Sequence, residues 1–358
     1  MITYLYCRYL VDNFLINEKK NQKILIIINR KDLVIQTTKS FFEFDSLNDK
    51  PLIIESIFAG SKKVDKANIV IGTYQSLKNY EQEYFDDFSV VICDEAHSAK
   101  AYSIRTDIYA KCFYAEYFFG MTATWPEYNT LDYLNVTSMF GALVFNKTTK
   151  QLIDDGNICP VFINKIKINY SEENKDFSKN LIESGIVGSE KYRIEKVFFQ
   201  NYEPRTNLIA KLINGFVNNH LILVESVEYC EFLKDYLSEK CPDRICEIIH
   251  GTIKDRDSIK EKMEIINNMI LIATYETMST GVSINNIHHV HFPNGGRSKF
   301  RVKQGTGRGV RLHNDKKVLN VFDYQDNMDR SDFKNHSSER NKIYEYEQHP
   351  SQEFEVTI

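Results

Sequence analysis

The sequence lacks the features that mark several classes of protein. Its seven cysteines include no Cys-x-x-Cys pair, and Cys241 and Cys246 stand too far apart, and without partners, for a zinc site. We therefore expect reduced thiols in a cytosol-like compartment. Residues 1–16 carry Arg8 and Asp12 within their apolar stretch and lack a small-residue cleavage site, and no other apolar run approaches membrane-spanning length. The sequence therefore predicts neither a signal peptide nor a membrane span.

A large excess of either charge is also missing. The formal net charge is −4 and the pI is near 6.2, so any nucleic-acid contact must come from a local cleft rather than from the field of the whole protein. No low-complexity segment and no short repeat period occurs, which excludes a solenoid. At 358 residues the chain is long enough for two ordinary domains with full cores.

Short apolar runs alternate with segments of helical spacing, such as residues 2–16. Buried strands are indicated at 24–28, 69–73, 90–94, 117–124, 221–224, 245–249 and 269–274, and a strand with one solvated face at 161–170. This alternation predicts an α/β fold with parallel sheets and with function at the carboxyl ends of the strands. A Gly/Pro break at 156–160 predicts a boundary between a first domain, 1–157, and a second, 158–330, with 331–358 as a C-terminal helix and strand extension.

One predicted strand delivers two adjacent carboxylates to its carboxyl end. The apolar run 90–93 is followed by Asp94, Glu95 and, two positions later, His97. A carboxylate such as Asp94 can hold Mg²⁺, Glu95 could orient and deprotonate an attacking water, and His97 could sense a neighbouring domain. Taken alone, these residues are more often a plain acidic turn after a buried strand, so the choice depends on the rest of the chain.

The strongly basic stretch of the sequence is 295–317. It encloses Gln304, Gly307, Arg308 and Arg311. Two arginines three residues apart share one face of a helix and would point together at an anion such as phosphate. A solvated charged surface is the alternative, which the glycine-flanked spacing makes less favourable.

Four segments, taken in order, resemble the motifs of superfamily 2 helicases, which are motors with two RecA-like domains and ATP bound between them. The four are Asp94-Glu95-Ala96-His97 for the DEAH form of the Walker B motif, Thr122-Ala123-Thr124 for the coupling motif, Thr280-Gly281-Val282-Ser283-Ile284 for the fifth motif, and Gln304 with Gly307-Arg308 and Arg311 for the sixth. The resemblance covers nearly the whole chain. It implies an α/β protein of two tandem RecA-like parallel-sheet domains.

The resemblance also implies ATP and Mg²⁺ as cofactors. Asp94 would ligate Mg²⁺, Glu95 would activate water, and Arg308 and Arg311 would reach the γ-phosphate as arginine fingers. The other nucleotide-side positions that it implies are Gln304 and Gly281.

Residues at strand ends are implied to grip the nucleic-acid backbone without reading its sequence. These are Gly72, Thr73, Thr274 and Thr280. Thr122 and Thr124 would couple hydrolysis to movement. For each threonine a purely structural role stays open, because β-branched residues are common at strand ends.

Within the superfamily, the compact size and the closing stretch 339–354 look most like phage recombination helicases of the UvsW type. The partners implied by this resemblance are single-stranded or branched DNA and RNA–DNA hybrids. The implied role is unwinding in DNA recombination, replication or repair, in the cytoplasm of a bacterial host.

One element of the family does not occur in the 358 residues. A P-loop needs Gly-x-x-x-x-Gly-Lys-Ser/Thr between a strand and a helix, because its amides surround the phosphates and its lysine reaches the β- and γ-oxygens. The family has it just before the helix expected here at 2–16. We therefore expect a first domain that is truncated at its N-terminus, with a P-loop segment supplied in cis or in trans. The chain alone is expected to be a poor ATPase with an unpaired strand edge in its first sheet.

Two alternatives to an active helicase stay open. An ATPase-silent DNA-binding remnant, or a fragment of a split helicase, would bind single strands or forks without turning over ATP. The motor part of a restriction or defence enzyme would have a nuclease or methylase partner.

Overall fold

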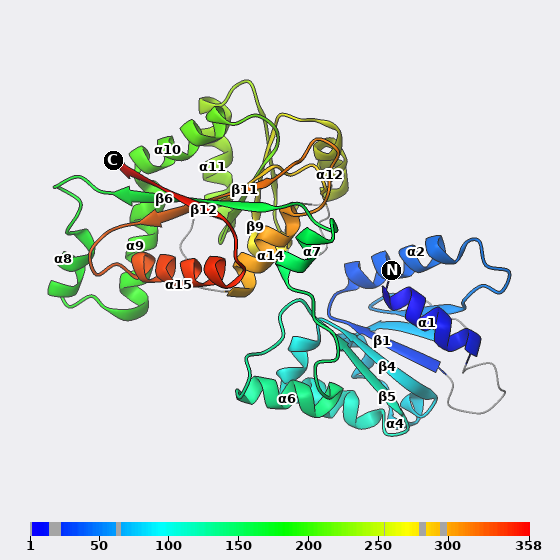
Figure 1. The fold of residues 1–358 in the computed structure, drawn as a ribbon. Coiled ribbons are helices and arrows are strands. Elements are labelled where there is room, and N and C mark those ends of the chain that lie inside the picture. Colours follow the sequence, from blue (N-terminus) through cyan, green and yellow to red (C-terminus); the bar gives the residue numbers. More distant parts are fainter. Residues whose placement is uncertain (1, 14–22, 62–65, 254, 279–283, 294–298) are drawn as a thin grey trace. The chain divides into compact units, whose positions relative to one another are not determined.

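The computed structural model of this chain describes residues 2–13, 23–61, 66–253, 255–278, 284–293 and 299–358. Two compact units make up the chain, residues 1–146 and 147–358 (Figure 1). Each has its own parallel sheet and its own core.

The first unit is a five-stranded sheet in the order β2-β3-β1-β4-β5, with every described strand pairing parallel. Its elements are α1 (Ile2–Asn13), β1 (Lys23–Ile28), α2 (Lys31–Asp45), β2 (Ile54–Ile57), β3 (Ile69–Thr73), α3 (Tyr74–Leu77), α4 (Gln82–Phe85), β4 (Phe88–Asp94), the 3₁₀ helix η1 (Ala96–Lys100), α5 (Tyr102–Asp107), the 3₁₀ helix η2 (Tyr109–Lys111), β5 (Tyr117–Met121) and α6 (Leu131–Phe140). Strands β1, β3 and β4 are apolar because helices cover both of their faces.

The second unit is a seven-stranded sheet in the order β12-β6-β11-β10-β7-β9-β8, again with parallel pairing throughout the described strands. Its elements are α7 (Thr149–Asp154), β6 (Val161–Asn169), α8 (Phe177–Glu183), α9 (Gly188–Asn201), α10 (Glu203–Gly215), β7 (His220–Val224), α11 (Val227–Lys240), β8 (Ile245–Ile249), α12 (Arg256–Ile265), β9 (Met269–Thr274), α13 (Tyr275–Met278), β10 (His289–Phe292), α14 (Lys299–Gly309), β11 (Leu319–Asp326), α15 (Asp332–Tyr346) and β12 (Ser351–Thr357).

The predicted α/β fold with two tandem parallel sheets is confirmed. The continuous apolar runs are strands, whereas β2, β10 and β11 have no counterpart among the predicted strands. The Gly/Pro break at 156–160 lies between α7 and β6, inside the second unit, and residues 331–358 add α15 and the edge strand β12 to that same unit. Among the described helices, none is both long and apolar enough to span a membrane.

Candidate functional site

The acidic turn follows directly from the end of β4. Asp94 is the last residue of this strand, and η1 begins at Ala96. Between them Glu95 takes a left-handed backbone conformation, with φ 53° and ψ 51°. For a residue with a side chain this conformation costs about 1–2 kcal/mol, and such strain concentrates at functional sites. The turn therefore holds Glu95 in a costly geometry at the carboxyl edge of the sheet.

Hydrogen bonds join this turn to the threonines that follow β5. Nδ1 of His97 lies 2.9 Å from Oγ1 of Thr122 and 3.3 Å from Oγ1 of Thr124. Oε2 of Glu95 lies 3.3 Å from His97 Nδ1 and accepts a 3.5 Å hydrogen bond from Thr122 Oγ1. The backbone N–H of Thr124 also donates to Thr122 Oγ1 at 3.1 Å. Two segments that sequence analysis singled out separately thus form one connected polar cluster.

A glycine that sequence analysis did not single out lets the turn approach β5. A Cβ built on Gly120 would lie 2.8 Å from Ala96 Cβ and 2.8 Å from the Phe140 ring, closer than real atoms approach. Gly120 pairs with Cys93 across the β4–β5 ladder, one position before Asp94. The glycine therefore allows η1 to lie against β5, the strand that Thr122 follows. The sequence signal was a lone glycine inside an otherwise aromatic strand.

The electrostatics of Asp94 fit a cation. Burial, and then the charge of Glu95, raises the pKa of the Asp94 carboxyl, while the backbone N–H of Glu95 donates to its Oδ1 at 3.0 Å. A divalent cation would relieve both effects, and Mg²⁺ is commonly held by one or two carboxylates together with substrate phosphates and water. Among the described residues no cluster of three or more His, Cys, Asp or Glu side chains is placed to bind a metal without such help.

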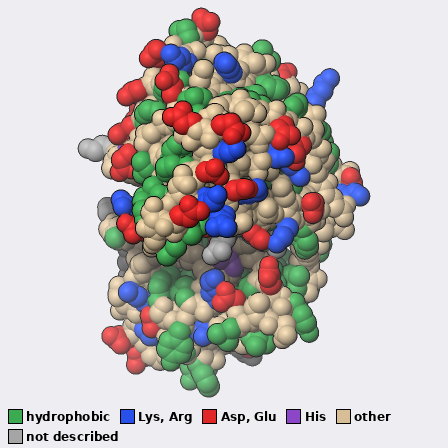
Figure 2. Space-filling model, turned by 90° about the vertical axis from the view of Figure 1, so that its left-hand side faces the viewer, with side chains coloured by type: hydrophobic (Ala, Val, Ile, Leu, Met, Phe, Trp, Pro, Cys, Tyr) green, Lys and Arg blue, Asp and Glu red, His purple; other side chains and the backbone are tan. Residues whose placement is uncertain are grey.

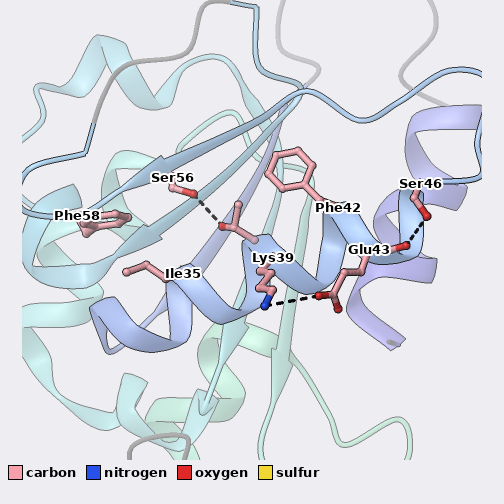
Figure 3. Close-up of a pocket in the computed structure, with 8 residues that line it drawn as sticks. Ile35, Lys39, Phe42, Glu43, Ser46, Ser56 and Phe58 are labelled. Carbon is pink, nitrogen blue, oxygen red and sulfur yellow. Dashed lines mark hydrogen bonds and ion pairs between the residues drawn. The ribbon is translucent and has the colours of Figure 1, made fainter. Parts of the chain in front are cut away.

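A cavity of the first unit lies away from this polar cluster. It has a volume of about 730 Å³ and runs between α2 and the edge strand β2 (Figure 3). Ile35, Phe42 and Phe58 give it an apolar wall, and Thr38 and Ser56 hydrogen-bond at 2.8 Å across it. None of its lining residues belongs to the predicted site.

The strand-end threonines are engaged within their own units. Thr73 is buried at the end of β3 and donates to the Ser76 hydroxyl at 3.0 Å, and Gly72 leaves room for Leu77 of α3. Thr274 is buried at the end of β9, with its Oγ1 2.8 Å from that of Thr277. These contacts fasten short helices to strand ends. Thr280 and Gly281 lie outside the described residues.

In the second unit, α14 carries the arginine motif. Cβ atoms built on Gly305 and Gly309 would lie 2.8 Å and 2.6 Å from Leu223 and Leu319 side chains, so these glycines seat the helix on the sheet. Arg308 lies half-buried on the helix, but Arg311 follows its end at Gly309. The prediction that the two arginines share one helical face is therefore wrong. The side chain of Gln304 lies outside the described part of the chain.

Part of the basic stretch serves the fold. Lys316 is buried, and its Nζ donates to the carbonyls of Asn285, Ile287 and Gly309 at 2.7, 3.0 and 2.9 Å. Burial lowers the pKa of Arg311, and the carboxylate of Glu264 partly offsets this. On the face in Figure 2, basic and acidic side chains are interspersed. The number of Lys and Arg residues in 295–317 is therefore larger than the number of cationic side chains available to a ligand.

Comparison with known proteins defines the class to which this arrangement is related. Residues 4–127 match the family described as type III restriction enzyme, res subunit. A fragment of an HsdR subunit of a type I restriction enzyme from Vibrio vulnificus has the same fold, with a TM-score of 0.64 and 21% identity over 94% of this chain and 57% of that one. With the two parallel sheets and the ordered motifs, the resemblance to superfamily 2 helicases with tandem RecA-like domains is confirmed.

Within that class, the chain is 27% identical over 337 residues to the ATP-dependent DNA helicase UvsW of Enterobacteria phage T4, covering 91% of this chain and 62% of the helicase. It is also 22% identical over 330 residues to a type I restriction enzyme EcoAI endonuclease subunit of Escherichia coli, covering 82% of this chain and 38% of that subunit. The chain thus spans less than two thirds of the length of either relative.

Proposed function

We propose that this chain is the two-domain core of an ATP-dependent nucleic-acid motor that unwinds or remodels branched DNA or R-loops. The observation that carries the proposal is the polar cluster of Glu95, His97, Thr122 and Thr124. It connects the residue proposed to activate water with the segment proposed to transmit movement. The similarity to a phage DNA helicase supports DNA as the substrate.

In the proposed reaction each residue has a separate task. Asp94 would hold Mg²⁺ bound to the phosphates of ATP, and that ion would neutralise charge developing on the phosphoryl group. Glu95 would orient and deprotonate the attacking water, while the left-handed turn fixes its carboxylate. His97 would pass changes at Glu95 to Thr122 and Thr124 through their hydrogen bonds. Arg308, Arg311 and Gln304 are proposed to face the nucleotide from the second unit.

The nucleic-acid side is proposed at the strand ends with Gly72, Thr73, Thr274 and Thr280. The hydroxyls of Thr73 and Thr274 already have intramolecular partners. Backbone amides at these strand ends are therefore the better candidates for phosphate contacts. The expected partners are single-stranded or branched DNA and RNA–DNA hybrids, with DNA recombination or repair as the setting. The P-loop would be supplied in cis or in trans.

Hydrolysis of ATP with and without forked DNA tests this proposal. Three proteins are compared: the 358-residue chain, the same chain with a strand and P-loop joined ahead of Ile2, and a Glu95→Gln version of that joined chain. We expect turnover above background from the second alone, since the amides and lysine of a P-loop are needed to hold the phosphates. A robust DNA-stimulated rate from the 358-residue chain would contradict the assigned need for a P-loop.

A silent DNA-binding remnant is the second candidate. It predicts fork binding with no hydrolysis by any of the three proteins. The third candidate is the motor part of a restriction or defence enzyme, which the similarity to restriction enzyme subunits supports. It predicts hydrolysis together with copurification of a nuclease or methylase partner.

A further inference from the structure

Helix α14 is held by the segment through which the chain enters the second unit. This connector, residues 147–160, contains α7 and leads into β6. Figure 1 shows α7, α14 and the end of α15 close together on one side of the second sheet. The connector touches the arginine-bearing helix through two separate sets of contacts.

The first set is centred on Glu347, which follows α15. Its Oε2 accepts a 2.5 Å hydrogen bond from the Thr149 hydroxyl of α7, and its Oε1 forms an ion pair with Lys303 of α14. Only 9% of the Glu347 side chain is exposed. Burial alone would raise the pKa of this carboxyl, but the hydrogen bonds from Lys303 and Thr149 outweigh it and lower the pKa. One carboxylate thus joins three helices that are far apart in sequence.

The second set lies at the other end of α14. The N–H of Cys159 donates to the carbonyl of Val310 at 2.8 Å, and its thiol approaches the carbonyl of Gly309 at 3.9 Å. Lys316 donates to the same Gly309 carbonyl. Because Gly305 and Gly309 also seat the helix directly on the sheet, α14 has little freedom to move unless the connector moves with it.

We propose that Glu347 is a positioning residue that couples the connector 147–160 of the second unit to α14 and thereby sets the orientation of Arg308. The function of this coupling rests on the proposed ATPase activity, while the coupling itself does not. Movement of the connector would displace Lys303 through Thr149 and Glu347. Lys303 lies five residues before Arg308 on the same helix. A carboxylate is required at this place, since only a charged acceptor pairs strongly with both a hydroxyl and an ammonium group.

Amide hydrogen exchange of the full 358-residue chain, without nucleotide, tests the coupling. We compare the wild type with Glu347→Gln, Thr149→Val and the double variant, and use Glu345→Gln as the control because Glu345 is exposed on α15. Glu347→Gln is expected to speed exchange in both α14 and α7 by about tenfold, the effect of losing one charged hydrogen bond. Amides of β9 serve as an internal reference for the fold of the unit.

Thr149→Val is the decisive variant, because Thr149 reaches α14 through Glu347. It should speed exchange in α14, and the double variant should be no faster than Glu347→Gln alone, since both changes break one connected contact. Additive effects, an unchanged α14 in Glu347→Gln, or equal effects of Glu345→Gln would each overturn the proposal.

In the chain joined to a P-loop, Thr149→Val should lower kcat about threefold or more while the KM for ATP stays unchanged, as expected for a group that matters in the transition state. A fall in β9 protection of the same size would instead indicate general destabilisation and overturn the positioning role. If the joined chain hydrolyses no ATP but the exchange results hold, the coupling stands and the proposed function fails.

Discussion

The interiors of the two units differ in chemistry. Among the described residues of the first unit, the buried polar side chains are Asp45, Glu55 and Thr73. In the second unit the buried set includes two arginine–aspartate pairs, a lysine–glutamate pair and several histidines. The first unit is therefore stabilised mainly by apolar burial, whereas the second also depends on specific hydrogen bonds and ion pairs that must stay matched.

Two hydrogen-bond networks of the second unit show how those buried groups are matched. Arg205 of α10 donates to both oxygens of Asp326, at 2.8 and 3.0 Å, and Tyr170 donates to the same carboxylate at 2.6 Å. In β7 and β10, Nδ1 of His220 lies 2.9 Å from Nε2 of His291, whose Nδ1 lies 3.0 Å from the Tyr324 hydroxyl. The first network pairs a charged arginine with a carboxylate, and the second joins neutral histidines to a tyrosine hydroxyl.

Removing one member of the buried ion pair should have the largest effect. Asp326→Asn leaves the Arg205 charge buried without its counter-ion, which is expected to destabilise the second unit by about 3–5 kcal/mol. Hydrogen exchange in β7 and β11 measures the loss. Trp125 is the single tryptophan of the chain and lies in the first unit, so its fluorescence should report unchanged unfolding there.

The matching control replaces both partners. Arg205→Met combined with Asp326→Leu removes the charges and fills similar volume, so it should cost much less than the single change. If the double variant is as unstable as Asp326→Asn, packing rather than charge is responsible.

Acid should destabilise the second unit before the first. Burial lowers the pKa of His289 to about 4, and burial also holds the pKa of His220 and His291 well below the ordinary histidine value. The unfolded chain then binds more protons than the folded chain between about pH 6.5 and pH 4, so stability falls as the pH drops through that window. For His289 alone the loss at pH 5 is about 2 kcal/mol.

Urea unfolding at pH 7 and pH 5, followed by hydrogen exchange in both units, checks this difference. A His289→Gln variant should show a weaker pH dependence in the second unit. An equal loss of stability in both units at pH 5 would contradict the proposed difference between the two interiors.

A steric change should affect the first unit instead. Gly120→Ala places a methyl group 2.8 Å from Ala96 Cβ, beneath the turn that carries Glu95 and His97. We expect a loss of about 1–3 kcal/mol, because neither backbone can yield easily. The control is Gly307→Ala in α14, which meets nothing within 4 Å and should stabilise by about 0.5–1 kcal/mol. Thermal unfolding monitored at Trp125 measures the first change, and exchange in α14 measures the second.

The same difference in chemistry decides what the sequence could predict. Residues 24–28, 90–93 and 221–224 are continuous apolar runs, and all lie in strands. Strand β10 was not predicted, because its buried histidines make it look polar. Strand β11 was not predicted, because Asp323 and Asp326 are neutralised by Arg340 and Arg205, which are 17 and 121 residues away in the sequence. Such pairings are long-range, so a local pattern does not reveal them.

The candidate site, like the fold, could be predicted only in part. The two motifs that meet at His97 could be found from residue spacing, but their hydrogen bonds depend on β5 lying beside β4 and on Gly120. Arg311 was misplaced because its spacing from Arg308 fits a helix that in fact ends at Gly309. The helix end depends on Lys316 and Cys159, neither of which has a local signature.

The smallest effect is expected from an ion pair that is chemically similar but exposed. Lys23 and Asp87 of the first unit lie 2.9 Å apart, with 38% and 52% of their side chains exposed. Asp87→Asn should change the stability of the first unit by less than about 0.5 kcal/mol, because water already screens the pair. Urea unfolding followed at Trp125 measures Asp87→Asn, and exchange in β7 and β11 measures Asp326→Asn. The comparison isolates burial as the variable, since an aspartate carboxylate becomes an amide in both variants. A loss at Asp87 as large as that at Asp326 would mean that ion pairing itself, and not the buried polar interior of the second unit, accounts for the difference between the two halves of the chain.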